Sequence, residues 1–186
     1  MKKILFCGGG SAGHVVPNIA IIESLGGNAE SLYIGTDGIE KRICNENGVK
    51  FYEFNAAKFV RGKILCNLAL PFKLFKSVKQ VGEMLDEIKP DLVFCKGGYA
   101  CFPPAIAAAK RDIPVITHES DVSAGLANKL IAKKCKKVLT AFPQTAKAFG
   151  YGICTGTPMR ESLFGRNKAE ARKKFNLDMR PTVIVT

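Results

Sequence analysis

The chain has 186 residues, more than one minimal domain and fewer than two domains of ordinary size. Hydrophobic residues make up 47% of it and charged residues 24%, a composition that excludes disordered and fibrous proteins. The 28 basic and 16 acidic side chains leave a net charge of +12, and no run of about 18 uncharged apolar residues predicts a membrane-spanning helix.

Short apolar runs and helical patterns alternate along the chain. The expected strands lie at 3–7, 31–35, 49–54, 91–95, 113–117, 137–141 and 152–155. The expected helices lie at 17–25, 39–47, 72–88, 104–111, 125–132 and 145–149. This alternation predicts an α/β fold, a Rossmann-like parallel sheet with helices on both faces and right-handed crossovers. In such sheets ligands bind beyond the carboxyl ends of the strands.

The loop after the first expected strand contains the pattern G-x-G-x-x-G, formed by Gly8, Gly10 and Gly13. We expect it to open a helix that has Pro17 in its first turn. The missing side chains allow backbone N–H groups and the helix N-terminus to approach a diphosphate. A tight turn without a ligand is the alternative interpretation.

A second glycine loop, Lys96-Gly97-Gly98-Tyr99, follows the expected strand at 91–95. Two glycine loops at one edge of a sheet are unusual for a simple dinucleotide fold. They suggest a ligand that has a diphosphate and another bulky part. Turn glycines beside a core tyrosine are the alternative.

Polar side chains follow the expected strand at 113–117, namely His118, Glu119, Ser120 and Asp121, and Asn128 lies in the next helix. Such groups can bind sugar hydroxyls or move protons. They can equally be a core histidine and helix-capping acids. Both histidines of the chain, His14 and His118, fall in these loops, which strengthens the functional interpretation.

A basic and apolar stretch spans residues 58–79 and contains no acidic residue. Its basic residues are Lys58, Arg61, Lys63, Lys73, Lys76 and Lys79, and its apolar ones include Leu65, Leu68, Leu70, Phe72 and Phe75. Apolar side chains ringed by lysines are typical of a segment that lies on an anionic bilayer. Basic charge also fits nucleic acid, although the leucines do not. A core helix with a solvated lysine face is the third interpretation.

The seven cysteines lie far apart in the sequence, and no pair has C-x-x-C spacing. Structural zinc sites use closely paired ligands, and disulfide scaffolds belong to small proteins in oxidising compartments. The spacing therefore predicts free buried thiols and no metal site. We also expect no cofactor.

Seven motifs occur in this order along the chain: Gly9 to His14, Lys96 to Tyr99, Pro103 with the alanine-rich helix, His118 to Asp121, Gly125 to Lys129, Ala141 to Pro143 and Thr155 to Arg160. Together they resemble the MurG family of bacterial peptidoglycan N-acetylglucosaminyltransferases. The resemblance covers about residues 1 to 165. Ser120, Asp121 and Thr157 depart from the common pattern and match a variant that some Gram-positive members carry.

The resemblance implies an inverting GT-B enzyme that transfers GlcNAc from UDP-GlcNAc to the 4-hydroxyl of the MurNAc sugar of lipid I, giving lipid II. It implies a peripheral protein on the cytoplasmic, anionic face of the membrane, with no nucleic-acid partner. His14 would be the catalytic base. The acceptor and its diphosphate would contact Gly9, Gly10, Ser11, Gly13, His14, Gly97, Gly98, Tyr99, His118, Glu119 and Asn128. Candidate contacts to the nucleotide sugar are Ser11, Asn128 and Arg160, and the membrane patch would comprise Leu65, Leu68, Leu70, Phe72, Lys73, Phe75 and Lys76.

The resemblance also divides the chain. Residues 1–162 would be the acceptor-binding domain, 163–180 a basic linker, and 181–186 the first strand of a donor domain that binds most of UDP-GlcNAc. A chain that ends there is expected to bind acceptor without transferring sugar.

Two alternatives of other classes stay open at this stage. The first is a nicotinamide-dependent oxidoreductase that uses Gly8, Gly10 and Gly13, with Asp37 on the ribose. The second is a non-catalytic module that binds a membrane surface or nucleic acid.

Overall fold

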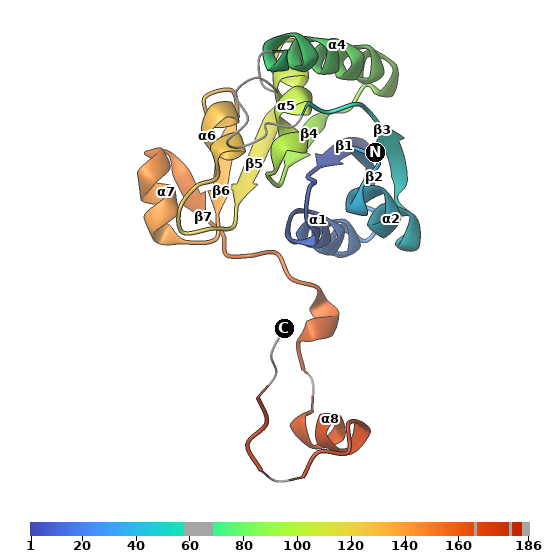
Figure 1. Cartoon of the computed structure of the whole chain (residues 1–186), viewed down its shortest axis with the longest axis vertical. Helices are drawn as coiled ribbons and strands as arrows, with labels where there is room; N and C mark the ends of the chain where they lie inside the picture. The colour runs from blue at the N-terminus through green and yellow to red at the C-terminus, as the bar shows by residue number, and fades with distance from the viewer. Residues whose placement is uncertain (58–68, 166, 179, 184–186) are drawn as a thin grey trace.

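One parallel sheet organises the protein. The computed structural model describes residues 1–57, 69–165, 167–178 and 180–183. Its seven strands have the order β3-β2-β1-β4-β5-β6-β7 (Figure 1). They are β1 (Lys2–Cys7), β2 (Ala29–Gly35), β3 (Lys50–Glu53), β4 (Leu92–Cys95), β5 (Val115–Glu119), β6 (Lys137–Thr140) and β7 (Gly152–Cys154). All seven strands predicted between residues 3 and 155 are present, with ends that differ by at most two residues.

Helices connect the strands and cover the sheet on both faces, as predicted. They are α1 (Ala12–Leu25), α2 (Ile39–Glu46), α4 (Leu70–Ile88), α5 (Phe102–Ala109), α6 (Leu126–Ala132) and α7 (Pro143–Phe149). A further helix, α8 (Lys168–Lys174), follows the last strand. Two short 3-10 turns, η1 (Tyr99–Cys101) and η2 (Glu161–Leu163), complete the described elements.

The start of α1 differs from the prediction. The helix begins at Ala12 because Ser11 takes the extended conformation of an N-cap. Gly13 and His14 therefore lie on the helix, and Pro17 lies inside it, not in its first turn. The proline removes one hydrogen bond to the Gly13 carbonyl. Gly13 is exposed, so water can solvate that carbonyl.

The core has one layer on each side of the sheet. Phe6, Val15, Ile19, Tyr33 and Ile43 pack between the sheet and helices α1 and α2. The opposite layer includes Leu5, Val81, Leu85, Ala105 and Ile131 and lies under α4, α5 and α6. Side chains alternate across each strand, so neighbours such as Leu5 and Phe6 serve opposite layers.

The strand order reverses between β1 and β4. From β1 the chain moves outward through β2 and β3, then returns through α4 to β4 on the other side of β1. The loops after β1 and β4 therefore diverge at a switch point, where open α/β sheets bind ligands. Both glycine loops lie at this switch point.

Beyond β7 the chain leaves the sheet and its residues are largely exposed, including η2 and α8 (Figure 1). Asn167 caps α8 by accepting a hydrogen bond of 2.8 Å from the Ala169 N–H. The strand expected at 181–186 is not seen at 181–183, which have no regular structure, and 184–186 lie outside the described residues. Among the described helices, none has the length and apolar character needed to cross a membrane.

Candidate functional site

The two glycine loops touch each other at the switch point. Gly98 has φ +81° and ψ 163°, and a Cβ there would collide with the Gly9 carbonyl oxygen. Gly10 has φ +88°, and a Cβ on it would lie 3.0 Å from the Tyr99 ring. Only residues without a side chain allow this approach. The predicted residues of both loops thus form one continuous surface.

The N-terminus of α1 opens onto this surface. Ser11 makes no side-chain capping bond, and no acidic residue occupies the first turn of the helix. A Cβ on Gly13 would meet nothing closer than the Ser11 Oγ at 3.8 Å. Unpaired N–H groups at a helix start attract anions, and here there is room for one.

His14 projects from α1 against the second glycine loop. A Cβ on Gly97 would lie 3.3 Å from the imidazole Nδ1, and one on Gly98 would lie 3.1 Å from its Cδ2. The ring is half-buried, and in the described part of the chain its nitrogens make no hydrogen bond. An imidazole in this position can accept a proton from a bound group.

A cleft of about 380 Å³ lies beside His14. Its polar residues come from the ends of several elements: His14, Gly98, Tyr99, Glu119, Asp121 and Asn128. Its other wall is apolar and comes mainly from α4, α5 and α6: Ala57, Leu70, Leu74, Phe102, Leu126, Ala127 and Leu130. The cleft therefore suits a ligand with a polar group and an adjoining apolar chain.

Glu119 and Asn128 form a fixed network at the end of β5. Glu119 accepts hydrogen bonds from the N–H groups of Asp121 (3.0 Å) and Gly125 (2.8 Å) and from the Asn128 amide (2.9 Å). Asn128 also accepts one of 2.8 Å from the Thr117 hydroxyl. Burial alone would raise the pKa of Glu119, but these donors outweigh it and hold the pKa below its ordinary value.

This network makes the N-terminus of α6 differ from that of α1, although both follow glycine-containing loops in the sequence. The Glu119 carboxylate fills the N-terminus of α6 through the Gly125 N–H. The first turn of α1 contains no acidic residue, and the Glu40 carboxylate lies ahead of the helix, 3.5 Å from the Gly10 nitrogen. An anionic ligand is therefore favoured at α1 and disfavoured at α6.

The sequence profile of the glycosyltransferase family 28 N-terminal domain matches residues 4–140. This chain belongs to glycosyltransferase family 28. The chain is 42% identical, over 99% of its length, to a protein of Clostridium tetani. That protein is a UDP-N-acetylglucosamine--N-acetylmuramyl-(pentapeptide) pyrophosphoryl-undecaprenol N-acetylglucosamine transferase. A protein of the same name from Lachnospira eligens is also 42% identical, over the whole chain.

The chain spans about half the length of the curated relatives it matches, 53% for Clostridium tetani and 54% for Lachnospira eligens. Among solved structures, MurG of Acinetobacter baumannii aligns with a TM-score of 0.71 and 27% identity, covering 87% of this chain and 47% of that one. The UDP-GlcNAc 2-epimerase of Neisseria meningitidis aligns over 84% of this chain and 46% of its own, with a TM-score of 0.64. Its 16% identity shows a shared fold alone.

These matches do not support the oxidoreductase alternative for the family 28 domain. Asp37, its proposed ribose ligand, is exposed, and its carboxylate lies 3.1 Å from the Lys41 Nζ.

His118 does not line the cleft of the family 28 domain. Its ring is buried, and its Nε2 lies 2.8 Å from the Gly156 carbonyl oxygen, so Nε2 is the donor. Nδ1 is buried and has no partner among the described residues. Burial first, and the nearby Lys96 charge second, lower the pKa of His118. A neutral His118 therefore links the end of β5 to the segment after β7 through its hydrogen bond to Gly156.

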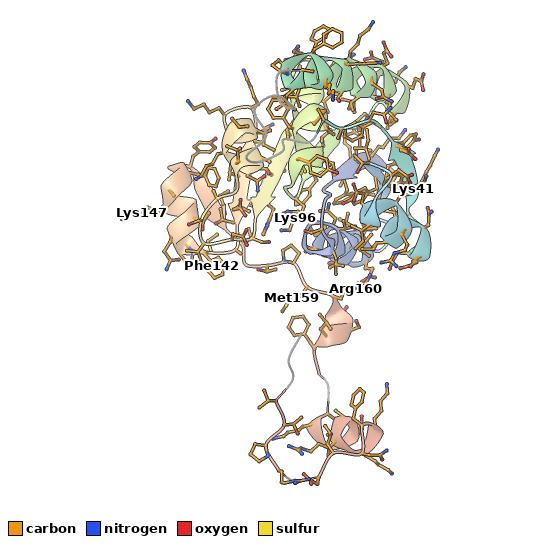
Figure 2. The ribbon with its side chains drawn as sticks, viewed as in Figure 1. Lys41, Lys96, Phe142, Lys147, Met159 and Arg160 are labelled. Carbon is orange, nitrogen blue, oxygen red and sulfur yellow. The ribbon has the colours of Figure 1, made fainter. Side chains whose placement is uncertain are left out.

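Two buried charged residues at the switch point were not among the candidate site residues, although Lys96 belongs to the second glycine loop. Glu40 of α2 accepts hydrogen bonds from the Thr36 N–H at 3.1 Å and hydroxyl at 2.5 Å, and its carboxylate lies 3.5 Å from the Gly10 nitrogen. Lys96, labelled in Figure 2, is 1% exposed. It donates a hydrogen bond to the Ser120 hydroxyl, one of the positions that depart from the family pattern. Burial lowers the pKa of Lys96. Nothing in their spacing marks either residue as buried.

Arg160 lies outside the cleft of the family 28 domain. Its guanidinium donates a hydrogen bond of 2.9 Å to Asn47 and lies 3.4 Å from the Glu23 carboxylate (Figure 2). It holds the segment after β7 against α1 and the end of α2. The structure thus gives Arg160 an anchoring contact and does not bring it to the candidate sugar contacts Ser11 and Asn128.

The predicted membrane patch is described in part. Leu65 and Leu68 lie outside the described residues. Leu70 lines the cleft, whereas Phe72 and Phe75 are 74% and 64% exposed on α4, beside the exposed Lys73 and Lys76. The core-helix interpretation holds for the opposite side of α4, where Val81 and Leu85 are buried.

Proposed function

We propose that this domain holds the lipid-linked acceptor of an N-acetylglucosaminyltransferase, which moves GlcNAc from UDP-GlcNAc to the MurNAc 4-hydroxyl of lipid I. The two-sided cleft is the observation that carries the proposal. Its polar residues lie at the switch point, and its apolar wall runs along α4 and α6. An acceptor made of a sugar, a diphosphate and a polyprenyl chain has the same order of polar and apolar parts.

The diphosphate is assigned to the N-terminus of α1. Ser11, Gly13 and the backbone of Gly9 and Gly10 lie there, and no acidic side chain occupies the first turn. Backbone N–H groups and the helix dipole offset phosphate charge without a metal ion. Gly98 and Tyr99 line the facing wall, with Gly97 just before them in the same loop, and Asn128 and Glu119, hydrogen-bonded to each other, line the cleft beside it.

His14 is assigned as the general base. The 4-hydroxyl oxygen attacks C1 of GlcNAc, its proton passes to the imidazole, and the C1–O bond to UDP breaks, with inversion at C1. A sugar hydroxyl is a weak nucleophile, so removal of its proton lowers the barrier. The relatives that carry this activity are about twice as long as this chain, and we expect the 186-residue chain alone to bind acceptor without transfer.

Gly13→Asp tests the diphosphate site, because it should weaken ligand binding without destabilising the fold. There is room for the new side chain, and a carboxylate in the first turn stabilises a helix by about 0.3–1 kcal/mol. The same charge repels a diphosphate. We expect a water-soluble lipid I analogue with a short prenyl chain to bind the wild type, to bind Gly13→Asn nearly as well, and to bind Gly13→Asp far more weakly, by isothermal titration calorimetry. Equal affinity of all three proteins would contradict the assignment.

The membrane surface is assigned to the first turns of α4. Phe72 and Phe75 can insert into a bilayer while Lys73 and Lys76 face anionic headgroups. The chain is therefore expected to sediment with vesicles that contain phosphatidylglycerol. Phe72→Ser and Phe75→Ser should weaken that binding, whereas Phe175→Ser, which changes a phenylalanine of similar exposure (66%), should not. Tight binding to DNA at physiological salt would favour the nucleic-acid alternative.

A further inference from the structure

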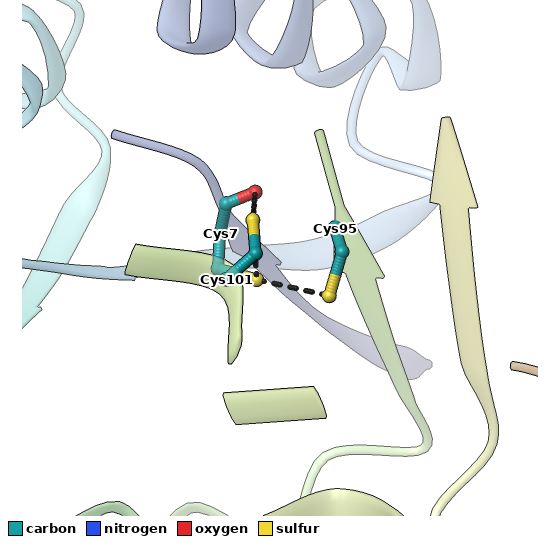
Figure 3. A group of neighbouring side chains, drawn as sticks. All are labelled: Cys7, Cys95 and Cys101. Atoms are coloured by element: carbon teal, nitrogen blue, oxygen red, sulfur yellow. Dashed lines mark hydrogen bonds between the residues drawn. The ribbon is translucent and has the colours of Figure 1, made fainter. Parts of the chain in front are cut away.

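Three cysteines that are far apart in the sequence meet beneath the glycine loops. Cys7 ends β1, Cys95 ends β4, and Cys101 lies in η1 (Figure 3). Cys7 and Cys95 are register partners in the sheet. The Cys7 Sγ lies 3.2 Å from the Cys95 Sγ and 3.6 Å from the Cys101 Sγ. All three side chains are fully buried.

This cluster differs from the other described cysteines. Cys44, Cys135 and Cys154 have no second thiol within hydrogen-bonding distance, whereas the ligand atoms of the cluster all lie within 4.8 Å of one another. Across the described residues, no other group of three histidine, cysteine or acidic side chains comes together in this way.

We propose that Cys7, Cys95 and Cys101 form a three-thiolate site for a divalent d10 cation of the zinc class. Thiolate sulfur is the preferred ligand of such ions, at a metal–sulfur distance of about 2.3 Å. Three sulfurs around one ion in a plane would then be about 4.0 Å apart. The observed separations of 3.2 and 3.6 Å are shorter than this spacing, so the sulfurs would have to move apart to admit the ion.

The surroundings supply an outer shell. The Gly97 N–H donates to the Cys101 Sγ at 3.2 Å, a bond that a coordinated thiolate retains. The Cys101 thiol also faces the Gly97 carbonyl oxygen at 3.0 Å, and the cation would replace that contact. Binding converts one M²⁺ and three thiols into a M(SR)₃⁻ centre and three released protons.

Lys96 offers the compensating charge. It follows Cys95 directly, and its side chain is buried. In the described part of the chain it donates a hydrogen bond to Ser120 and forms no ion pair. A centre of net charge −1 would partner this buried cation. The bound ion would also connect β1, β4 and η1, and so fix the two glycine loops relative to each other.

The test uses the full 186-residue chain, reduced, freed of metal and kept anaerobic, with Cd²⁺ as the probe. The ultraviolet thiolate-to-metal absorption should saturate at one Cd²⁺ per chain, X-ray absorption should show three sulfur neighbours, and Zn²⁺ should displace the Cd²⁺. Cys95→Ser and Cys101→Ser should lower affinity by more than the roughly 10–100-fold typical of a lost outer-shell partner. Cys44→Ser, which changes a buried thiol elsewhere, and Cys154→Ser should retain the wild-type affinity.

Several results would overturn the site. They are no stoichiometric Cd²⁺ binding by the wild type, fewer than three sulfur neighbours, loss of the signal in Cys154→Ser, or a Cys7–Cys95 disulfide in the protein isolated under non-reducing conditions. The sulfur count is measured on the wild type, so the proposal can be refuted even if a cysteine variant fails to fold.

Discussion

Replacing Gly98 by alanine tests whether the two glycine loops depend on backbone contact. At φ +81° and ψ 163° an L-residue is strained by about 1–3 kcal/mol. Its Cβ would also collide with the Gly9 carbonyl oxygen, and overpacking of this kind costs roughly 1–3 kcal/mol more. We therefore expect Gly98→Ala to lower the free energy of unfolding by about 2–6 kcal/mol.

Gly27→Ala is the matched control. Gly27 has φ +85°, yet a Cβ there would meet no atom within 4 Å. Only backbone strain applies, about 1–2 kcal/mol. Replacing glycine also restricts the unfolded chain, but that gain of about 0.4–1 kcal/mol is common to both variants and cancels in the comparison.

Urea unfolding followed by circular dichroism measures both variants at one temperature and pH. Gly98→Ala should be the less stable of the two by at least about 1 kcal/mol. It should also weaken binding of the acceptor analogue, because the new Cβ lies 3.1 Å from the His14 Cδ2. If Gly98→Ala is no more destabilising than Gly27→Ala, the contact between the loops does not exist in solution.

Three further predictions concern the polar network and the anchor of the segment after β7. Because the pKa of Glu119 is held below its ordinary value of 4.5, its stabilisation is present above that pH and is lost as the pH falls through the folded-state pKa. Urea unfolding below about pH 5 should therefore show a steeper loss of stability in the wild type than in Glu119→Gln, and equal slopes would contradict the network. Asn128→Asp replaces the amide that donates to Glu119 at 2.9 Å by a second carboxylate. It should lower the free energy of unfolding by on the order of 3 kcal/mol at neutral pH and by less in acid. A loss of stability that does not change with pH would contradict this geometry. Arg160→Ala should lower the free energy of unfolding by less than about 1 kcal/mol, because its partners Glu23 and Asn47 are exposed. A larger loss of stability in urea unfolding would contradict this description of the Arg160 contacts.

Most strands could be predicted from the sequence because they are short apolar runs bounded by turn residues, although the apolar run at 181–186 forms no strand at 181–183. The start of α1 could not, because Gly10, Gly13 and Pro17 all resemble loop residues by type. The helix begins at Ala12 because the backbone of Ser11 is extended.

The site could be predicted only where motifs lie directly after strands. His14, Gly98, Tyr99, Glu119 and Asn128 line the same cleft, as their positions indicated. Its apolar wall on α4 and α6 depends on how helices pack, which composition does not give. Cys7, Cys95 and Cys101 meet only because β4 pairs with β1, a pairing set by strand order and absent from the cysteine spacing.

Transfer of GlcNAc tests the central claim most directly. The assay joins the 186-residue chain to the portion of the Clostridium tetani relative that lies beyond the aligned residues, and follows transfer from UDP-GlcNAc to lipid I. With His14 as the base, His14→Ala should lower kcat by roughly 10²–10⁴-fold. Ser24→Ala, an exposed change at the far end of α1, should leave kcat unchanged. An active fusion whose kcat is unaffected by His14→Ala would contradict the account.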